Sequence, residues 1–167
     1  EAAKRNAAGD LDGALLAVND MLALVPGDAA IAAERTKLAR AKDAVAEALA
    51  RTRDFVAGRR YDLALSALAE AEKINAKLPQ IAEWRQKVQS AKTLAETELA
   101  GSLAQAGQLA DQKNFDAARR VLDAAREAGP LPQSLAGKAK DLERRIDAGR
   151  LRLDAAKREQ DNRNQSA

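Results

Sequence analysis

The chain has 167 residues, of which 32% are charged, 2% are aromatic and 41 are alanine. It contains no cysteine and no histidine, which excludes disulfides, thiolate or imidazole catalysis, and zinc or haem sites built on those side chains. With 28 basic and 25 acidic residues, the net charge of +3 does not indicate the clustered basic face of a nucleic-acid-binding protein. We therefore expect no catalytic residues, no cofactor, no metal and no nucleic-acid partner.

The residue types favour helix along the whole chain. Strong helix formers dominate, whereas the β-branched and aromatic residues that fill strands are scarce. Glycine, proline and N-cap residues predict short helices at about 11–24, 61–76 and 115–128, and long helices at about 29–57, 80–112 and 133–158. Residues 161–167 form a polar tail without periodicity, where we expect fraying. The predicted fold class is all-α.

Each predicted short helix opens with the same pattern. The three copies are Gly-Asp-Leu-Asp-Gly-Ala at 9–14, Arg-Arg-Tyr-Asp-Leu-Ala at 59–64 and Lys-Asn-Phe-Asp-Ala-Ala at 113–118. They lie 50 and then 54 residues apart. Apolar residues continue this register in the long helices at Ile31, Ile81 and Leu135, and seven residues later at Leu38, Val88 and Leu142. Because a seven-residue step returns to the same helical face, these pairs predict buried contacts in each unit.

This pattern resembles the second helix of the tetratricopeptide repeat, in which a bulky residue, an acidic residue, two small residues and a closing proline recur. The matching positions are Leu11, Tyr61 and Phe115 (bulky), Ala14, Ala64 and Ala118 (first small), Ala71 and Ala125 (second small), and Pro26 and Pro130 (closing). The family's first helix is matched only by Phe55 and Leu109, and its repeat of about 34 residues is shorter than the units here. The resemblance implies stacked helices that bind a protein or peptide along a groove.

We therefore expect a tetratricopeptide-like α-solenoid or helical bundle of alternating short and long antiparallel helices. It would be a single domain over residues 1–160, with units at about 1–27, 28–79 and 80–130 followed by the helix 133–158. A spectrin-like bundle and a coiled coil use helices of similar length. The alternation of lengths and the recurrent Tyr/Phe-Asp-x-Ala disfavour both alternatives.

Several polar and aromatic residues have both a structural and a functional interpretation. Asp12, Asp62 and Asp116 each lie in the first turn of a short helix, where the helix dipole favours a carboxylate. Trp84 shares a face with Ile81 and Val88, which predicts core packing. Three basic residues, Arg53, Arg59 and Arg60, are candidates for binding an acidic partner, and a solvated helix end is the competing interpretation.

The sequence favours a non-catalytic protein-interaction scaffold, expected to be a segment of a larger bacterial protein. Two alternatives stay open: a structural spacer or self-association module that forms a homo-oligomer, and a weak binder of an anionic surface. No apolar run reaches the length of a membrane span, the first residues do not resemble a signal peptide, and the alanine-rich apolar faces disfavour membrane contact. The cytoplasm and the periplasm both fit this composition.

Overall fold

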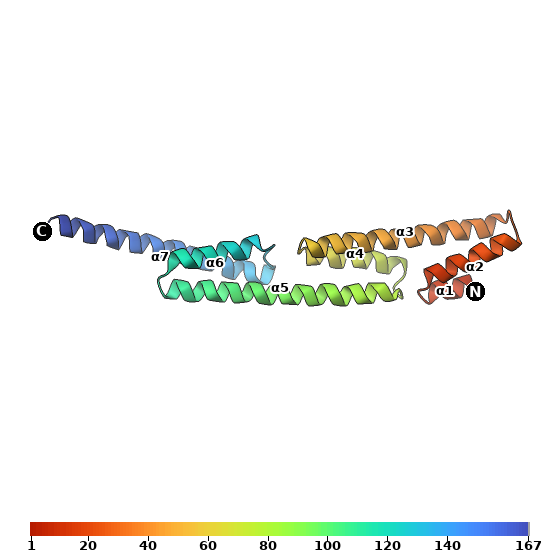
Figure 1. Cartoon of the computed structure of the whole chain (residues 1–167), viewed down its shortest axis with the longest axis horizontal. Coiled ribbons are helices and arrows are strands. Elements are labelled where there is room, and N and C mark those ends of the chain that lie inside the picture. Colours follow the sequence, from red (N-terminus) through yellow and green to blue (C-terminus); the bar gives the residue numbers. More distant parts are fainter. Residues whose placement is uncertain (167) are drawn as a thin grey trace. The chain divides into compact units, whose positions relative to one another are not determined.

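The computed structural model describes residues 1–166, and helix is the only regular secondary structure in that range (Figure 1). The helices are α1 (Ala2–Ala7), α2 (Leu11–Leu24), α3 (Ala29–Ala57), α4 (Tyr61–Ile74), α5 (Pro79–Asp111), α6 (Phe115–Glu127) and α7 (Gln133–Gln165). The all-α prediction is confirmed. The chain divides into two compact units, the first covering Glu1–Lys92 and the second starting at Thr93, so that α5 contributes to both.

The lengths of the helices alternate along the chain from α2 onward. Helices α2, α4 and α6 have 14, 14 and 13 residues, whereas α3, α5 and α7 have 29, 33 and 33. The six-residue helix α1 was not predicted. The predicted end of the last helix near residue 158 was wrong, because no proline follows Pro132 and an ion pair between Glu159 and Arg163 joins successive turns out to Gln165. Residue 167 of the expected polar tail lies outside the described residues.

The same chain reversal occurs at the start of all three short helices. A residue in the left-handed conformation ends the preceding helix: Gly9 (φ 85°), Arg59 (φ 54°) and Lys113 (φ 61°). The next backbone N–H then donates to a carbonyl five residues earlier: Asp10 to Arg5 (2.9 Å), Arg60 to Phe55 (2.7 Å) and Asn114 to Leu109 (2.9 Å). This pairing is the Schellman motif, which satisfies helix carbonyls that would otherwise lack a donor.

Side chains cap the helices that follow these and other turns. The Asp10 carboxylate accepts a hydrogen bond from the Gly13 N–H at 2.8 Å and so caps α2. Asp28 caps α3 by accepting from the N–H groups of Ala30 (2.8 Å) and Ile31 (3.1 Å). These bonds satisfy free N–H groups of the first helical turn, which is why the helices begin at these residues.

Small residues let each short helix approach its neighbours closely. Ala14, Ala64 and Ala118 are fully buried, and so are Val18, Leu68 and Leu122 four residues later. Of the remaining repeat positions, Leu11, Ala71 and Ala125 are buried, whereas Tyr61 and Phe115 are half-buried against the core of their unit. Because alanine adds only a methyl group to the helix surface, the short helix can lie close to the backbone of the long ones.

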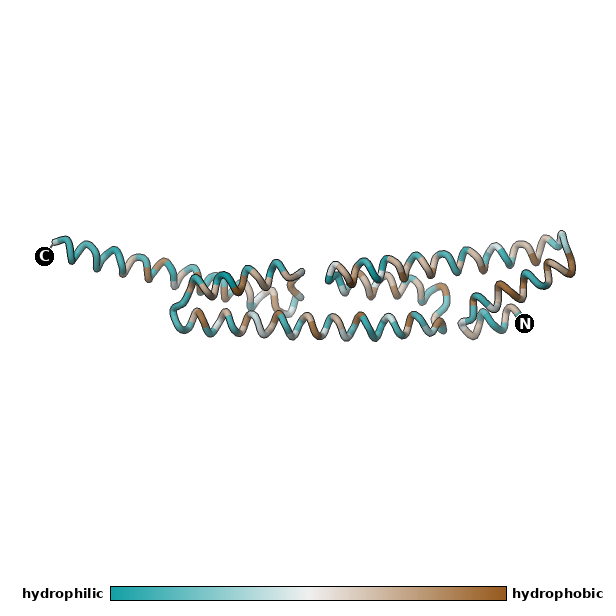
Figure 2. Tube along the Cα trace, viewed as in Figure 1, coloured by the Kyte–Doolittle hydropathy of each residue, from teal (hydrophilic) through white to brown (hydrophobic). Residues whose placement is uncertain are grey.

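Each unit has one apolar core. In the first unit the core joins α2, α3, α4 and the start of α5, and in the second it joins the later part of α5, α6 and the first half of α7. Apolar residues are prominent along α2, whereas the last turns of α7 are strongly hydrophilic (Figure 2). Every described residue of α7 from Arg150 onward is exposed.

An ion pair recurs between each short helix and the long helix that follows it. Its members are Asp12 and Lys42 (2.6 Å), Asp62 and Lys92 (2.6 Å), and Asp116 and Arg150 (3.6 Å). The hydrogen bond with Asp12 raises the pKa of Lys42 above its ordinary value. Because the carboxylates are largely exposed, these pairs add little stability.

Within the first unit, the turn between α1 and α2 lies against the turn between α4 and α5. The Asn75 side-chain amide donates to the Asn6 carbonyl at 2.6 Å. A Cβ atom placed on Gly9 would lie 2.3 Å from the Lys77 carbonyl oxygen, closer than any real contact allows. Only glycine fits both this approach and the left-handed backbone.

This contact predicts different costs for two glycine substitutions that both place alanine at positive φ. Gly27 has φ 97° and open space around its Cβ position, so Gly27→Ala should cost only about 1 to 2 kcal/mol of backbone strain. Gly9→Ala should cost about 1 to 3 kcal/mol more, because the methyl group must also displace the Lys77 backbone. Urea unfolding followed by the fluorescence of Trp84, the sole tryptophan, measures both. Equal losses of unfolding free energy in the two variants would contradict the close approach of Gly9 to the Lys77 backbone.

A second matched pair tests the packing of Phe115 on α7. A Cβ atom on Gly149 would lie 2.3 Å from the Phe115 ring, whereas one on Gly137 would meet nothing within 4 Å. Gly137→Ala should therefore stabilise the second unit by about 0.5 to 1 kcal/mol through helix propensity. Gly149→Ala should destabilise it by about 1 to 3 kcal/mol through overpacking. Urea titration of NMR amide peaks from α6 gives both values, and a gain for Gly149→Ala would refute this packing.

Candidate functional site

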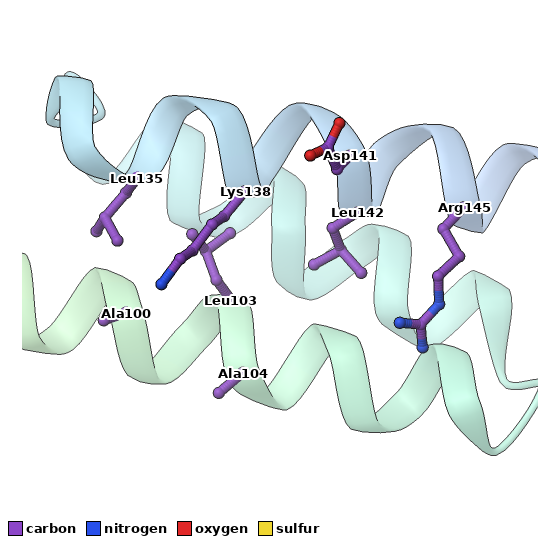
Figure 3. Close-up of a pocket in the computed structure, with 8 residues that line it drawn as sticks. All are labelled: Ala100, Leu103, Ala104, Leu135, Lys138, Asp141, Leu142 and Arg145. Atoms are coloured by element: carbon purple, nitrogen blue, oxygen red, sulfur yellow. The ribbon is translucent and has the colours of Figure 1, made fainter.

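An open groove of about 410 Å³ lies between α5 and α7 in the second unit (Figure 3). Its residues come from two turns of α5 and three of α7. They are Ala100, Leu103, Ala104, Leu135, Lys138, Asp141, Leu142 and Arg145. The two alanines are exposed on α5, and their small side chains leave the space between the helices open.

The floor of this groove is apolar. Leu103, Leu135 and Leu142 are buried and belong to the core of the second unit. Figure 3 shows these three side chains in the space between α5 and α7. A ligand in the groove would thus contact the edge of the core, where it could bury further apolar surface.

The charged groups of the groove differ in whether they already have a partner. Arg145 pairs with the Asp111 carboxylate and donates to the Gly107 carbonyl at 3.2 Å. Asp141 points away from α5 and lies 3.7 Å from Arg144 (Figure 3). Lys138 extends from α7 towards α5 and forms no ion pair or hydrogen bond with any residue in the described range 1–166. Of the two cations in the groove, Lys138 is therefore the one that could bind a ligand without breaking an ion pair between described residues.

Aligning the repeats shows which residues of the first unit correspond to the groove. A shift of 54 residues places Ala46 and Leu49 at the positions of Ala100 and Leu103, and Trp84 at the position of Lys138. In the first unit, Trp84 packs against the core, with the Arg53 guanidinium 5.5 Å and the Lys87 amine 5.2 Å from the ring centre. The ring is only half-buried, so Trp84 is less buried than the sequence-based prediction of a core position implied. The first unit therefore has a half-buried indole where the second unit has an exposed lysine.

A larger opening, of about 630 Å³, lies in the first unit between the α1–α2 turn, α3 and the start of α5. Its charged residues already have partners. Asp12 binds Lys42 at 2.6 Å, Asp10 caps α2, and Arg53 lies over Trp84. A ligand here would have to compete with these contacts, so the groove of the second unit is the better candidate.

The structure does not gather the three arginines singled out from the sequence into one site. Arg53 lies over Trp84, and Arg60 lies over the Phe55 ring at 5.0 Å. Phe55 and Arg60 are also the two residues joined by the backbone hydrogen bond of the turn, so their contact is local. Arg59 is the left-handed residue of the same turn. Lys138 was missed, although aligning the repeats places it opposite Trp84.

Ion pairs between α6 and α7 hold the helix that forms one wall of the groove. Arg126 donates to both carboxylate oxygens of Glu143, at 2.8 and 2.6 Å. Arg119 adds contacts of 3.2 Å to Glu143 and 3.0 Å to Asp147. The hydrogen bond from Arg126 lowers the pKa of Glu143 below its ordinary value of 4.5. This bidentate pair fixes both distance and orientation between the helices.

The lowered pKa of Glu143 makes the stability of the second unit depend on pH. The unfolded chain binds the proton more tightly than the folded chain, so the contribution is complete above about pH 4.5 and is lost as the pH falls through the lowered value. Glu143→Gln should reduce this loss. Urea titrations of α6 amide peaks at pH 6 and pH 3 measure this loss, with Glu127→Gln, an exposed glutamate at the end of α6, as control. If Glu143→Gln lost as much stability between pH 6 and pH 3 as the wild type, Glu143 would not be the group responsible for this pH dependence.

Within residues 1–166, no group of three or more acidic side chains is placed to hold a metal ion. No helix in that range combines the length and the apolar character needed to cross a membrane. Comparison of the chain with protein-family models, with curated proteins and with solved structures gives no match.

Proposed function

We propose that this chain is a non-catalytic helical-repeat scaffold, tetratricopeptide-like with lengthened helices, that binds a segment of a partner protein in the groove between α5 and α7. The observation that carries the proposal is the groove itself, in which an apolar floor lies beside the unpaired Lys138. Repeated helical hairpins commonly present such grooves as binding surfaces. The same turn and the same ion pair recur in three helical hairpins, which supports a repeat architecture.

The chemistry of the groove indicates what such a segment would carry. Leu103, Leu135 and Leu142 favour an aliphatic or aromatic side chain. Lys138 favours a carboxylate placed next to that side chain, on the side of α7. An acidic, amphipathic segment with one large apolar residue therefore fits better than a basic one.

A spacer or self-association module is the second candidate, and one observation favours it. From Arg150 to Ser166 every residue of the chain is exposed, although the helix continues to Gln165. A helical segment whose side chains are all exposed can set a distance or pair with another helix. Light scattering distinguishes the two functions, because only self-association raises the apparent mass with concentration.

Charge reversal at the groove provides the test of binding. With a photo-crosslinking residue at Ala104, extracts of the source cells should give a discrete product, and none with the crosslinker at the exposed Ala124 on α6. Lys138→Glu should lower the yield roughly two- to fivefold, as expected for an exposed ion pair. Lys140→Glu makes the same charge change on the same helix outside the groove and should leave the yield unchanged. Equal effects of the two substitutions, or no product, would reject the proposal.

A further inference from the structure

The stripe of α7 that lines the groove alternates apolar and basic side chains. Its members follow one another at steps of three, four and three residues: Leu135, Lys138, Leu142 and Arg145. Such steps keep side chains on one helical face. Figure 3 shows all four on the side of α7 that faces α5. The groove therefore has a second cation about two helical turns beyond Lys138, with Leu142 between the two.

The second cation, Arg145, already binds a carboxylate of this chain. Its side chain extends from α7 to α5, where it pairs with Asp111 and donates to the Gly107 carbonyl at 3.2 Å (Figure 3). The Asp111 side chain is 72% exposed, so solvent screens this ion pair and another carboxylate can replace Asp111 at little cost. The Gly107 carbonyl still holds the guanidinium after such an exchange. Asp111 thus shows where a carboxylate binds at this end of the groove.

The spacing of the two cations favours a helical ligand. Lys138 and Arg145 are seven residues apart, which is about 10.5 Å along α7. Residues i and i+7 of a second helix running along the groove have the same separation and share a face. In an extended segment, side chains on one face recur at about 6.6 Å and about 13 Å, so its carboxylates match the two cations less well. The small side chains of Ala100 and Ala104 let a helix approach α5 closely.

We propose that the groove binds an amphipathic helix of the partner protein through two carboxylates seven residues apart, one on Lys138 and one that replaces Asp111 on Arg145. An aliphatic side chain three or four residues after the first carboxylate contacts Leu142 between the two ion pairs. This inference rests on the proposed function and specifies the ligand of the same groove. It assigns Arg145 as a specificity-determining residue and Asp111 as its internal competitor.

A designed peptide provides the probe. It is an alanine- and glutamine-based helix with glutamates at i and i+7 and a leucine at i+4. The control peptide has the same composition, with the second glutamate at i+9 and therefore on the opposite face. The first peptide should shift the amide NMR peaks of Ala104 and Leu142 saturably. The control should bind about two- to fivefold more weakly, because it makes only one of the two exposed ion pairs.

Two substitutions separate recognition by Arg145 from support of the helices. Arg145→Gln and Asp111→Asn both remove the ion pair between α5 and α7, so a purely structural role would change peptide binding in the same direction. Arg145→Gln should instead weaken binding about two- to fivefold, whereas Asp111→Asn should strengthen it by a similar factor because the competitor is gone. Arg152→Gln and Asp154→Asn make the same charge changes on the exposed part of α7 and should leave binding unchanged.

The peptide titration and the crosslinking experiment at Ala104 test different claims. No saturable shift, equal binding of the two peptides, or the same direction of change for Arg145→Gln and Asp111→Asn would overturn this inference. If a crosslinked product still forms in that case, the proposed function stands alone. If the peptide binds with the expected signs and extracts give no product, the proposed function fails and the preference of the groove for paired carboxylates stands.

Discussion

Three chain reversals with a left-handed residue set the arrangement on which the rest of each unit depends. Gly9, Arg59 and Lys113 direct each short helix back along the helix that precedes it. The same turns fix which residues of the two helices come into contact, so Ala14, Ala64 and Ala118 all arrive at fully buried positions. Two of the three left-handed residues are not glycine, so packing elsewhere must offset a backbone cost of about 1 to 2 kcal/mol at each.

The surface charges follow the same repetition as the core. Each short helix has an aspartate in its first turn that reaches a basic residue on the following long helix, at Lys42, Lys92 or Arg150. Where a residue breaks the repetition, a surface of different character results. Lys138 lines the groove at the position of an indole, and Met21 is exposed where the matching Ala71 is buried.

The breaker residues and the helix-forming composition were sufficient to predict the fold class and most helix boundaries. Pro79 and Pro132 mark the starts of α5 and α7, and caps such as Asp28 mark others. Helix α1 was missed because six residues carry too little periodicity to be recognised. The ring contacts of Arg53 and Arg60 were also missed, because a sequence does not show which cation lies over which ring. Lys138 was missed as well, because its difference from Trp84 emerges only from a residue-by-residue comparison of the repeats.

The small size of the core side chains affects how stability varies with temperature. Much of the buried surface belongs to alanines such as Ala14, Ala48 and Ala106, each of which hides little more than a methyl group from water. The heat capacity of unfolding grows with the apolar area that unfolding exposes. A core of this kind implies a small heat-capacity change for its length. Its stability curve is accordingly broad and flat, and the free energy of unfolding declines gradually on both sides of its maximum.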